Sequence, residues 1–260
     1  MKLNCDMGES FGSYKIGCDE QVMKYVHMAN IACGAHGGDP MVMEKTVALA
    51  VQHKVIVGAH PGYPDLQGFG RRTIDYTAAE IRTMVLYQTG ALAAFCTAAG
   101  TPLGYVKPHG TLYNTMMAND TILLAVFQAL ASYDAKIPVM IQATPRWQHH
   151  EQLAKDHGVT LLWEAFADRA YEADGSLRKR HLPNAVHTSE QVLEQAEILC
   201  KDKFIAATDG TKLEFPVDAL CVHGDSESSI SVISQLRKLV DSYENCGSFR
   251  VQLFDSLSRR

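Results

Sequence analysis

The chain has 260 residues, of which 47% are hydrophobic and 20% are charged, a balance typical of a globular protein. This composition excludes a disordered chain, a collagen-like repeat and a coiled coil. The 24 basic and 29 acidic residues give a net charge of −5, so the chain lacks the basic surface that binds nucleic acid.

The seven cysteines are an odd number without CxxC spacing, which argues against a disulfide framework and a zinc ribbon. The first residues lack the apolar segment of a signal peptide, and no apolar run approaches the roughly 18 residues that span a bilayer. We therefore expect a cytoplasmic protein with reduced cysteines.

One unit recurs along the chain: a short apolar run, a loop rich in His, Gly, Pro and Asp, and an amphipathic segment. This repeat predicts strands that alternate with helices. The apolar runs do not alternate with polar residues, as expected for strands that are buried on both faces. The expected strands are residues 3–6, 28–33, 55–60, 104–109, 137–142, 159–166 and 219–223.

Two kinds of helix-start signal follow the strands. A capping residue directly before proline occurs at 39–40 and at 144–145. A threonine three residues before Glu or Gln, the spacing of a capping box, occurs at 77–80 and at 188–191. These signals predict a helix after each of the strands concerned.

Seven βα units without a Pro/Gly/Ser-rich linker favour one α/β domain, a closed or nearly closed, distorted (β/α)7 barrel of the TIM type. An open, doubly wound sheet is the main alternative. In a parallel barrel the carboxyl ends of all strands line one mouth, where barrel enzymes have their active sites.

Four of the eleven histidines end an apolar run and are followed at once by glycine or proline: His36, His60, His109 and His223. A single histidine at a strand end is about as often a packing residue as a functional one. Four at equivalent places weaken the packing explanation, so we expect them to converge at the barrel mouth.

Acidic side chains follow the strands in the same way. They are Asp6, Glu9, Asp39, Asp65, Glu164, Asp168 and Asp225, and two cations, Lys107 and Arg169, accompany them. The cations favour a substrate with an anionic group, since arginine binds carboxylate or phosphate through paired hydrogen bonds.

Two chemical interpretations of this cluster stay open. A catalytic zinc ion needs about three such ligands and an open position, but intervals of 24 and 49 residues between His36, His60 and His109 match no local ligand motif. The alternative is acid and base catalysis without a metal, by carboxylates and imidazoles around a water and a carbonyl. The sequence contains neither a phosphate-binding loop nor a nucleophile elbow.

Six motifs together resemble the LamB/YcsF family, which includes the A subunits of bacterial 5-oxoprolinase. They are LNCDMGE at 3–9, ANIACG with a following His and Gly-Asp at 29–39, GAHPGYPD with Phe-Gly-Arg at 58–71, VKPHGTLYN at 106–114, EAFADR with Asp-Gly-Ser-Leu at 164–177, and CVHGD at 221–225. The resemblance extends to about residue 243, which implies a barrel domain over 1–243 and a C-terminal tail, 244–260, expected to be poorly ordered.

The resemblance also implies a barrel similar to those of glycoside hydrolases and deacetylases. It implies an ATP-dependent ring opening of 5-oxo-L-proline to L-glutamate, shared with partner subunits B and C. Since this chain has no nucleotide motif, we hypothesise that the partners phosphorylate the lactam oxygen and that this chain opens the activated ring with water.

Roles are assigned from the chemistry of the reaction. Asp6 or Glu164 is expected to act as the base on water, and His109 or His223 as the acid on the ring nitrogen. The full set of catalytic candidates is Asp6, Glu9, His36, His60, His109, Glu164, Asp168 and His223. The substrate-binding candidates are Asn30, Asp39, Asp65, Lys107, Asn114, Arg169 and Asp225, of which Lys107 and Arg169 would hold the carboxylate or phosphoryl group and Asp39 and Asp65 would orient histidines.

Two competing functions remain. The chain could be a stand-alone, metal-dependent amidohydrolase or carbohydrate deacetylase, in which Asp6, His36 and His60 ligate zinc. It could also be a non-catalytic protein that only binds a small acid for its partners, although several acids and bases at one mouth argue against this. Whether a metal is bound is not fixed by the sequence.

Overall fold

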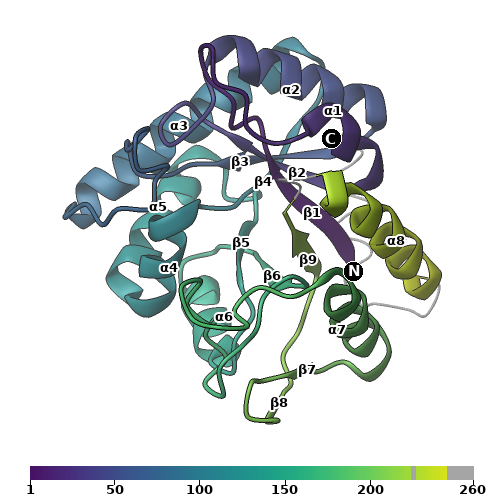
Figure 1. Ribbon diagram of the computed structural model, residues 1–260. Helices are drawn as coiled ribbons and strands as arrows, with labels where there is room; N and C mark the ends of the chain where they lie inside the picture. The colour runs from purple at the N-terminus through teal and green to yellow at the C-terminus, as the bar shows by residue number, and fades with distance from the viewer. Residues whose placement is uncertain (224–226, 245–260) are drawn as a thin grey trace.

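Seven parallel strands close into a barrel, in the order β1-β2-β3-β4-β5-β6-β9, so the expected barrel is confirmed (Figure 1). The computed structural model describes residues 1–223 and 227–244. The strands are β1 Lys2–Met7, β2 Met28–Ala32, β3 Ile56–His60, β4 Leu103–Val106, β5 Val139–Gln142, β6 Leu161–Phe166 and β9 Ala219–Val222. Nearly all of their residues are buried, in agreement with the continuous apolar runs.

Helices surround the barrel and connect successive strands (Figure 1). They are α1 Asp19–Val22, the 3-10 helix η1 Met23–Tyr25, α2 Pro40–His53, α3 Ala78–Ala98, α4 Gly110–Ala118, α5 Asp120–Asp134, α6 Trp147–Asp156, α7 Ser189–Asp202 and α8 Glu227–Glu244. An antiparallel pair, β7 Ile205–Ala206 and β8 Lys212–Leu213, lies outside the barrel. Among the described helices, none combines the length and the apolar content needed to cross a membrane.

Three of the four helix-start signals are confirmed. The Asp39 side chain accepts from the Val42 amide at the start of α2, and full capping boxes begin α3 at Thr77 and α7 at Thr188. The signal at 144–145 correctly predicts a helix after β5 but not its start, because α6 begins at Trp147 with Arg146 as its N-cap. The Thr144 carbonyl accepts from the Trp147 amide and therefore closes a turn that precedes the helix.

Strand β4 is shorter than expected, ending at Val106 instead of residue 109. Pro108 has no amide hydrogen to donate to a neighbouring strand. The Lys107 amide bonds to the carbonyl of Ala59 in β3 at 2.9 Å, and the His109 amide bonds to the carbonyl of Pro61, just after β3, at 2.8 Å. His109 is the N-cap residue of α4, which places its side chain at the carboxyl end of the barrel.

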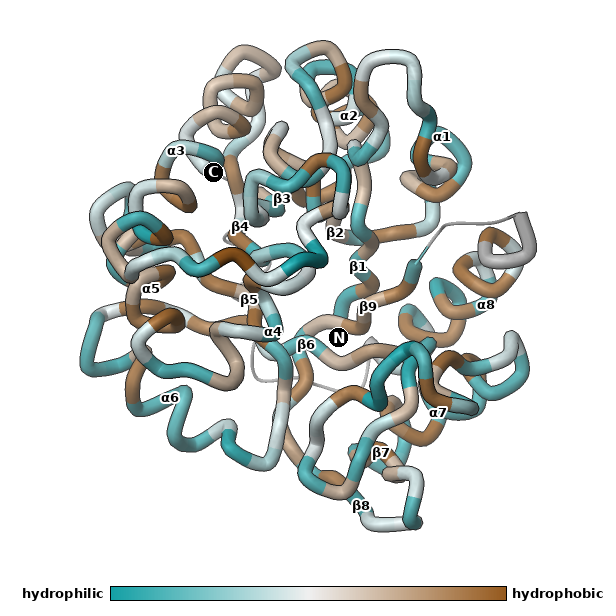
Figure 2. Tube along the Cα trace, turned by 60° about the vertical axis from the view of Figure 1, so that its left-hand side comes forward, coloured by the Kyte–Doolittle hydropathy of each residue, from teal (hydrophilic) through white to brown (hydrophobic). Residues whose placement is uncertain are grey.

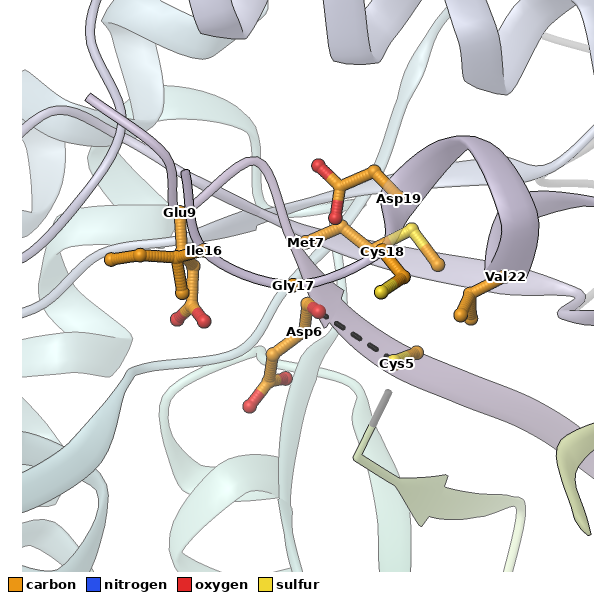
Figure 3. Close-up of a pocket in the computed structure, with 9 residues that line it drawn as sticks. All are labelled: Cys5, Asp6, Met7, Glu9, Ile16, Gly17, Cys18, Asp19 and Val22. Atoms are coloured by element: carbon orange, nitrogen blue, oxygen red, sulfur yellow. Dashed lines mark hydrogen bonds between the residues drawn. The ribbon is translucent and has the colours of Figure 1, made fainter. Parts of the chain in front are cut away.

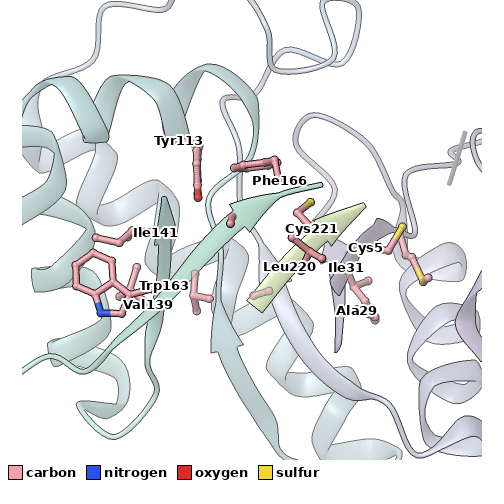
Figure 4. Packing of buried hydrophobic residues seen from close by; sticks show 14 of the residues in the cluster. Cys5, Ala29, Ile31, Tyr113, Val139, Ile141, Trp163, Phe166, Leu220 and Cys221 are labelled. Atoms are coloured by element: carbon pink, nitrogen blue, oxygen red, sulfur yellow. The ribbon is translucent and has the colours of Figure 1, made fainter. Parts of the chain in front are cut away.

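The core has two parts. A large cluster fills the space between the strands and the helices, and includes Trp163 and Ile141 (Figure 4). A small cluster of buried residues lies apart from it and consists of Met28, Tyr105, Met140, Leu162 and Ala219. The helices alternate hydrophobic and hydrophilic segments along their length, as expected when one face packs on the barrel (Figure 2).

Gly58 on β3 is expected to be intolerant of a side chain. A Cβ atom placed there would lie 2.2 Å from Cζ of the Tyr105 ring, which belongs to the neighbouring strand. We expect Gly58→Ala to lower the free energy of unfolding by about 1–3 kcal/mol, because the ring must move within a packed core. Urea denaturation measures this change.

Gly90→Ala is the matched control, since a Cβ at Gly90 in α3 meets nothing within 4 Å. In a helix interior this substitution stabilises by about 0.5–1 kcal/mol. The two variants should therefore change stability in opposite directions. Equal effects would show that Tyr105 is not held against Gly58.

Candidate active site

The carboxyl ends of the strands carry a buried network of charges around Lys107. Its ammonium lies 3.0 Å from Asp6 Oδ1 and 2.8 Å from Glu164 Oε1, and it donates to Cys221 Sγ at 3.4 Å. The Lys107 and Glu164 side chains are only 4% and 0% exposed. Burial alone would lower the pKa of Lys107, but Asp6, Cys221 and Glu164 hold it well above its usual value. The site therefore contains a charged lysine between two carboxylates.

Asp6 is the most connected acid of the network. Its Oδ1 accepts from Asn30 Nδ2 at 2.7 Å, and its Oδ2 lies 3.4 Å from His60 Nε2 and 4.0 Å from His223 Nε2. Burial raises the pKa of Asp6, but His60, Lys107 and His223 outweigh it and hold the pKa well below the usual range. Asp6 is consequently an ionised carboxylate that faces two histidines.

His223 is held by Asp168. Its Nδ1 lies 2.6 Å from Asp168 Oδ2, and its side chain is 18% exposed. Burial lowers the pKa of His223, but the Asp168 carboxylate and, to a smaller extent, Asp6 raise it above its usual value. Nε2 of this histidine faces Asp6, so His223 presents an N–H to the site when it is protonated.

This raised pKa gives the protein a defined pH dependence of stability. An unfolded histidine titrates near pH 6.5, and the folded chain binds the His223 proton more tightly. The stabilisation is complete below about pH 6.5 and is lost as the pH rises through the higher folded pKa. We expect Asp168→Asn to flatten this decline, as measured by urea unfolding at a series of pH values, whereas the exposed Asp174→Asn should preserve it. Equal slopes for the wild type and Asp168→Asn would contradict the assignment.

The other three strand-end histidines form a second group beside Asp6. The rings of His36 and His109 stack with centroids 3.6 Å apart, and His60 meets His109 edge to face. Glu9 Oε1 lies 3.2 Å from His36 Nε2 and 3.5 Å from His109 Nδ1. Burial lowers the pKa of His109 to about 3, and that of His36 well below its usual value. In the described part of the chain, these four residues form the group of potential metal ligands.

Glu9 and Asp6 approach this group from the same segment. Both line a small pocket that extends from β1 to the start of α1, and their carboxylates point the same way (Figure 3). Gly8 between them has a φ of +66°, a conformation that favours glycine, and its amide donates to Asp19 at 2.8 Å. The turn at Gly8 thus brings Glu9 back towards the barrel mouth.

Arg169 lies near two further arginines. Its guanidinium donates to the Ala185 and Arg178 carbonyls, at 3.2 and 2.6 Å. Burial and the positive charge of Arg180, with a smaller effect of Arg71, lower its pKa and outweigh the Asp168 carboxylate, which raises it. Three guanidinium groups in one region favour an anion there.

Three substrate-binding candidates lie outside the network around Lys107. Asp39 caps α2 and accepts from the Gly12 amide, and Asn114 is exposed on α4. Asp65 bonds to Arg72 and to the Gly68 amide, and Arg72 holds the pKa of Asp65 at about 2. Its loop contains Phe69, whose carbonyl accepts from His109 Nε2 at 2.8 Å. Asp225 falls outside the described residues.

Sequence reasoning missed several residues that complete the network. Tyr113 donates to Glu164 Oε2 at 2.7 Å, and Tyr105 donates to Asn30 at 2.5 Å. Tyr113 lies four residues after His109 on a helix, and that spacing places both on one face. Asn4, which accepts from Asn30 at 2.8 Å, lies two residues before Asp6 and therefore shares its face of β1. These helix and strand spacings were the sequence signals that could have identified Tyr113 and Asn4.

Comparisons with known proteins agree with this architecture. The model of the LamB/YcsF family matches residues 1–248. A 5-oxoprolinase A subunit from Vibrio campbellii is 52% identical over 239 residues, which are 92% of this chain and 94% of the relative. A 5-oxoprolinase A subunit from Pseudomonas putida is 49% identical over 243 residues, 93% of this chain and 94% of the relative.

Solved structures give the same result. A lactam utilization protein from Thermus thermophilus is 36% identical with a TM-score of 0.85, over 93% of this chain and 96% of that one. A putative cellobiose-phosphate cleavage protein from Enterococcus faecalis, 10% identical over 95% of this chain and 98% of that one with a TM-score of 0.52, shares the fold alone. The family match over nearly the whole chain confirms the resemblance of the six motifs: the chain belongs to the LamB/YcsF family.

Proposed function

We propose that this chain supplies the A subunit of a 5-oxoprolinase, a hydrolase that opens the ring of 5-oxo-L-proline to L-glutamate at the expense of ATP, together with partner subunits B and C. The proposal is supported by relatives that are named as 5-oxoprolinase A subunits. They are about half identical to this chain over roughly nine-tenths of both chains. The observation that carries it is the juxtaposition of Asp6 with His223 beside Lys107, a base next to an acid at the barrel mouth. Five described cysteines form no disulfide, in keeping with a cytoplasmic location: Cys18, Cys33, Cys96, Cys200 and Cys221.

The reaction can be written in balanced steps. The partners transfer the γ-phosphoryl group of ATP to the lactam oxygen, which yields ADP and an activated ring. Water adds to the activated carbon, and the C–N bond breaks as the nitrogen takes up a proton, which leaves γ-glutamyl phosphate. A second water hydrolyses this acyl phosphate to glutamate and inorganic phosphate. This chain performs the ring opening, for which it needs a base and an acid but no nucleotide site.

Asp6 suits the base better than Glu164. Its side chain is 15% exposed, whereas Glu164 is fully buried and occupied by Lys107 and Tyr113. The low pKa of Asp6 keeps it ionised at neutral pH, although it also limits its affinity for the proton. The 4.0 Å approach of Asp6 Oδ2 to His223 Nε2 offers that proton a route to the group with the higher pKa.

His223 suits the acid better than His109. Asp168 raises the pKa of His223 above its usual value, which favours the protonated ring that a proton donor requires. The pKa of His109 falls to about 3, and its Nε2–H is occupied by the Phe69 carbonyl. Arg169, with Arg71 and Arg180, would hold the substrate carboxylate or the phosphoryl group, because Lys107 is already enclosed by two carboxylates.

An omission experiment tests the proposal. The purified chain, its candidate partners, 5-oxoproline and ATP are combined, and glutamate is assayed. Glutamate is expected only when all the proteins and ATP are present, and the chain alone should show no turnover. Glutamate production by the partners without this chain would exclude the proposed role.

A stand-alone, metal-dependent amidohydrolase is the second candidate, and the group of Glu9, His36, His60 and His109 favours it. Such an enzyme would cleave its substrate without ATP. The same assay distinguishes the two functions, because hydrolysis by the chain alone would support the second.

A further inference from the structure

His60 Nε2 and His109 Nδ1 face each other across 3.0 Å within the group of strand-end histidines. His60 Nδ1 lies 2.6 Å from the Lys107 carbonyl, and His109 Nε2 lies 2.8 Å from the Phe69 carbonyl. A carbonyl oxygen only accepts, so both of these nitrogens carry the hydrogen of their ring. In neutral rings the remaining atoms, His60 Nε2 and His109 Nδ1, therefore present lone pairs to each other across 3.0 Å.

Carboxylate oxygens add to this concentration of acceptors. Glu9 Oε1 lies 3.5 Å from His109 Nδ1, and Asp6 Oδ2 lies 3.4 Å from His60 Nε2. The two histidines are 1% and 3% exposed, so water offers little screening. The Lys107 ammonium contacts Asp6 through Oδ1, whereas Asp6 Oδ2 and Glu9 Oε1 face the histidine nitrogens, and acceptors gathered in this way favour a cation between them.

The spacing fits a transition-metal ion. Histidine nitrogens bind Zn²⁺ at about 2.0–2.1 Å, which puts two nitrogens of a tetrahedral site about 3.3 Å apart. The observed 3.0 Å needs only a small opening of the pair. Hydrogen bonds from the far ring nitrogens to backbone carbonyls are the usual outer contacts of metal-binding histidines, because they fix the ring and its tautomer.

We propose that His60 Nε2, His109 Nδ1 and Glu9 Oε1 bind a divalent transition-metal ion such as Zn²⁺, with an open fourth position beside Asp6. His36 has a different place: its ring is parallel to that of His109, with an interplanar angle of 2°, so an ion in the plane of His109 lies outside the plane of His36. Its Nε2 contacts Glu9 Oε1 at 3.2 Å, and we assign it as a positioning residue for this carboxylate.

The site stands on its own geometry, whereas its use in ring opening rests on the proposed function. Three protein ligands with an open position are typical of catalytic zinc, which polarises an oxygen or lowers the pKa of bound water. The ligand set also differs from the one expected from the sequence, which combined Asp6 with His36 and His60. Asp6 Oδ1 is already engaged by Lys107 and Asn30.

Metal uptake by the full chain tests the site without substrate, ATP or partners. The protein is stripped with a chelator, dialysed and titrated with Zn²⁺ by calorimetry, and Co²⁺ is added in parallel to read the ligand geometry from its visible spectrum. We expect one ion per chain and a Co²⁺ spectrum of tetrahedral type. His60→Gln and His109→Asn should each weaken binding more than 100-fold, and His36→Gln by about 10–100-fold.

His149→Gln is the matched control, since His149 is 44% exposed on α6 and pairs with Asp120. It should bind metal like the wild type.

Glu9→Gln, at a partly exposed position, is the reserve variant if circular dichroism shows that a histidine variant fails to fold. Failure of the wild type to take up metal, or equal affinity in the ligand variants, would overturn the site and leave a shared proton between His60 and His109 as the explanation. Glutamate formation by the metal-free complex would remove only the catalytic use of the ion, and metal uptake without any glutamate formation would count against the proposed function alone.

Discussion

Replacing Lys107 by methionine is expected to lower the free energy of unfolding by about 3–5 kcal/mol, the usual cost of removing one partner from a buried ion pair. The ammonium lies between Asp6 and Glu164, and its loss leaves two carboxylates close together in a site where Glu164 is fully buried. The repulsion between them adds to the cost of burying each charge. Urea denaturation at neutral pH measures the change.

Two comparisons isolate the charge effect. Lys45→Met removes a lysine that pairs with Glu20 at the surface, where the side chains are 72% and 67% exposed, and should change stability far less. Combining Lys107→Met with Glu164→Gln should recover part of the loss, because one of the unpaired charges is then absent. A Lys107→Met variant as stable as Lys45→Met would show that the three charges do not form a coupled network.

Replacing Asp6 by asparagine is expected to slow glutamate formation by the complete complex by about 10²–10⁴-fold, the usual contribution of a positioned base. Asparagine keeps the size of the side chain and an oxygen for Asn30 and Lys107, so the contacts of Asp6 are changed as little as possible. Lys107 also retains Glu164 as a partner. The rate is measured with saturating ATP and 5-oxoproline.

Asp156→Asn is the control for this substitution, since Asp156 is exposed on α6 and accepts from Gln152. It should leave the rate unchanged. A circular dichroism spectrum confirms that Asp6→Asn is folded. Wild-type turnover by folded Asp6→Asn would exclude Asp6 as the base.

The barrel could be predicted from the sequence because its strands are buried on both faces and its helices carry strong start signals. Continuous apolar runs and the capping boxes at Thr77 and Thr188 depend on local chemistry, which is visible in a few residues. The end of β4 was not predictable in this way. It depends on hydrogen bonds from Lys107 and His109 to carbonyls in another segment, 48 residues earlier in each case.

The site was predicted as a set of residue types but not as a set of contacts. Strand ends converge in any parallel barrel, which is why His60, His109 and His223 could be grouped from the sequence. The difference in pKa between His223 and His109 could not be foreseen from the sequence, since it depends on the individual surroundings of each ring. Asp168 raises the pKa of His223, whereas burial lowers that of His109, and both residues follow an apolar run in the sequence. Asp39 also follows a predicted strand, but its side chain caps α2, so local hydrogen bonding decides its role.

Glutamate and ADP counted in the same reaction test the central claim most directly, because the claim assigns ring opening to this chain and phosphorylation to its partners. The wild-type complex should form the two products in equal amounts. In the complex with Asp6→Asn, ADP formation should continue while glutamate falls by at least about 100-fold. Equal amounts of glutamate and ADP at the wild-type rate from that variant complex would contradict the account.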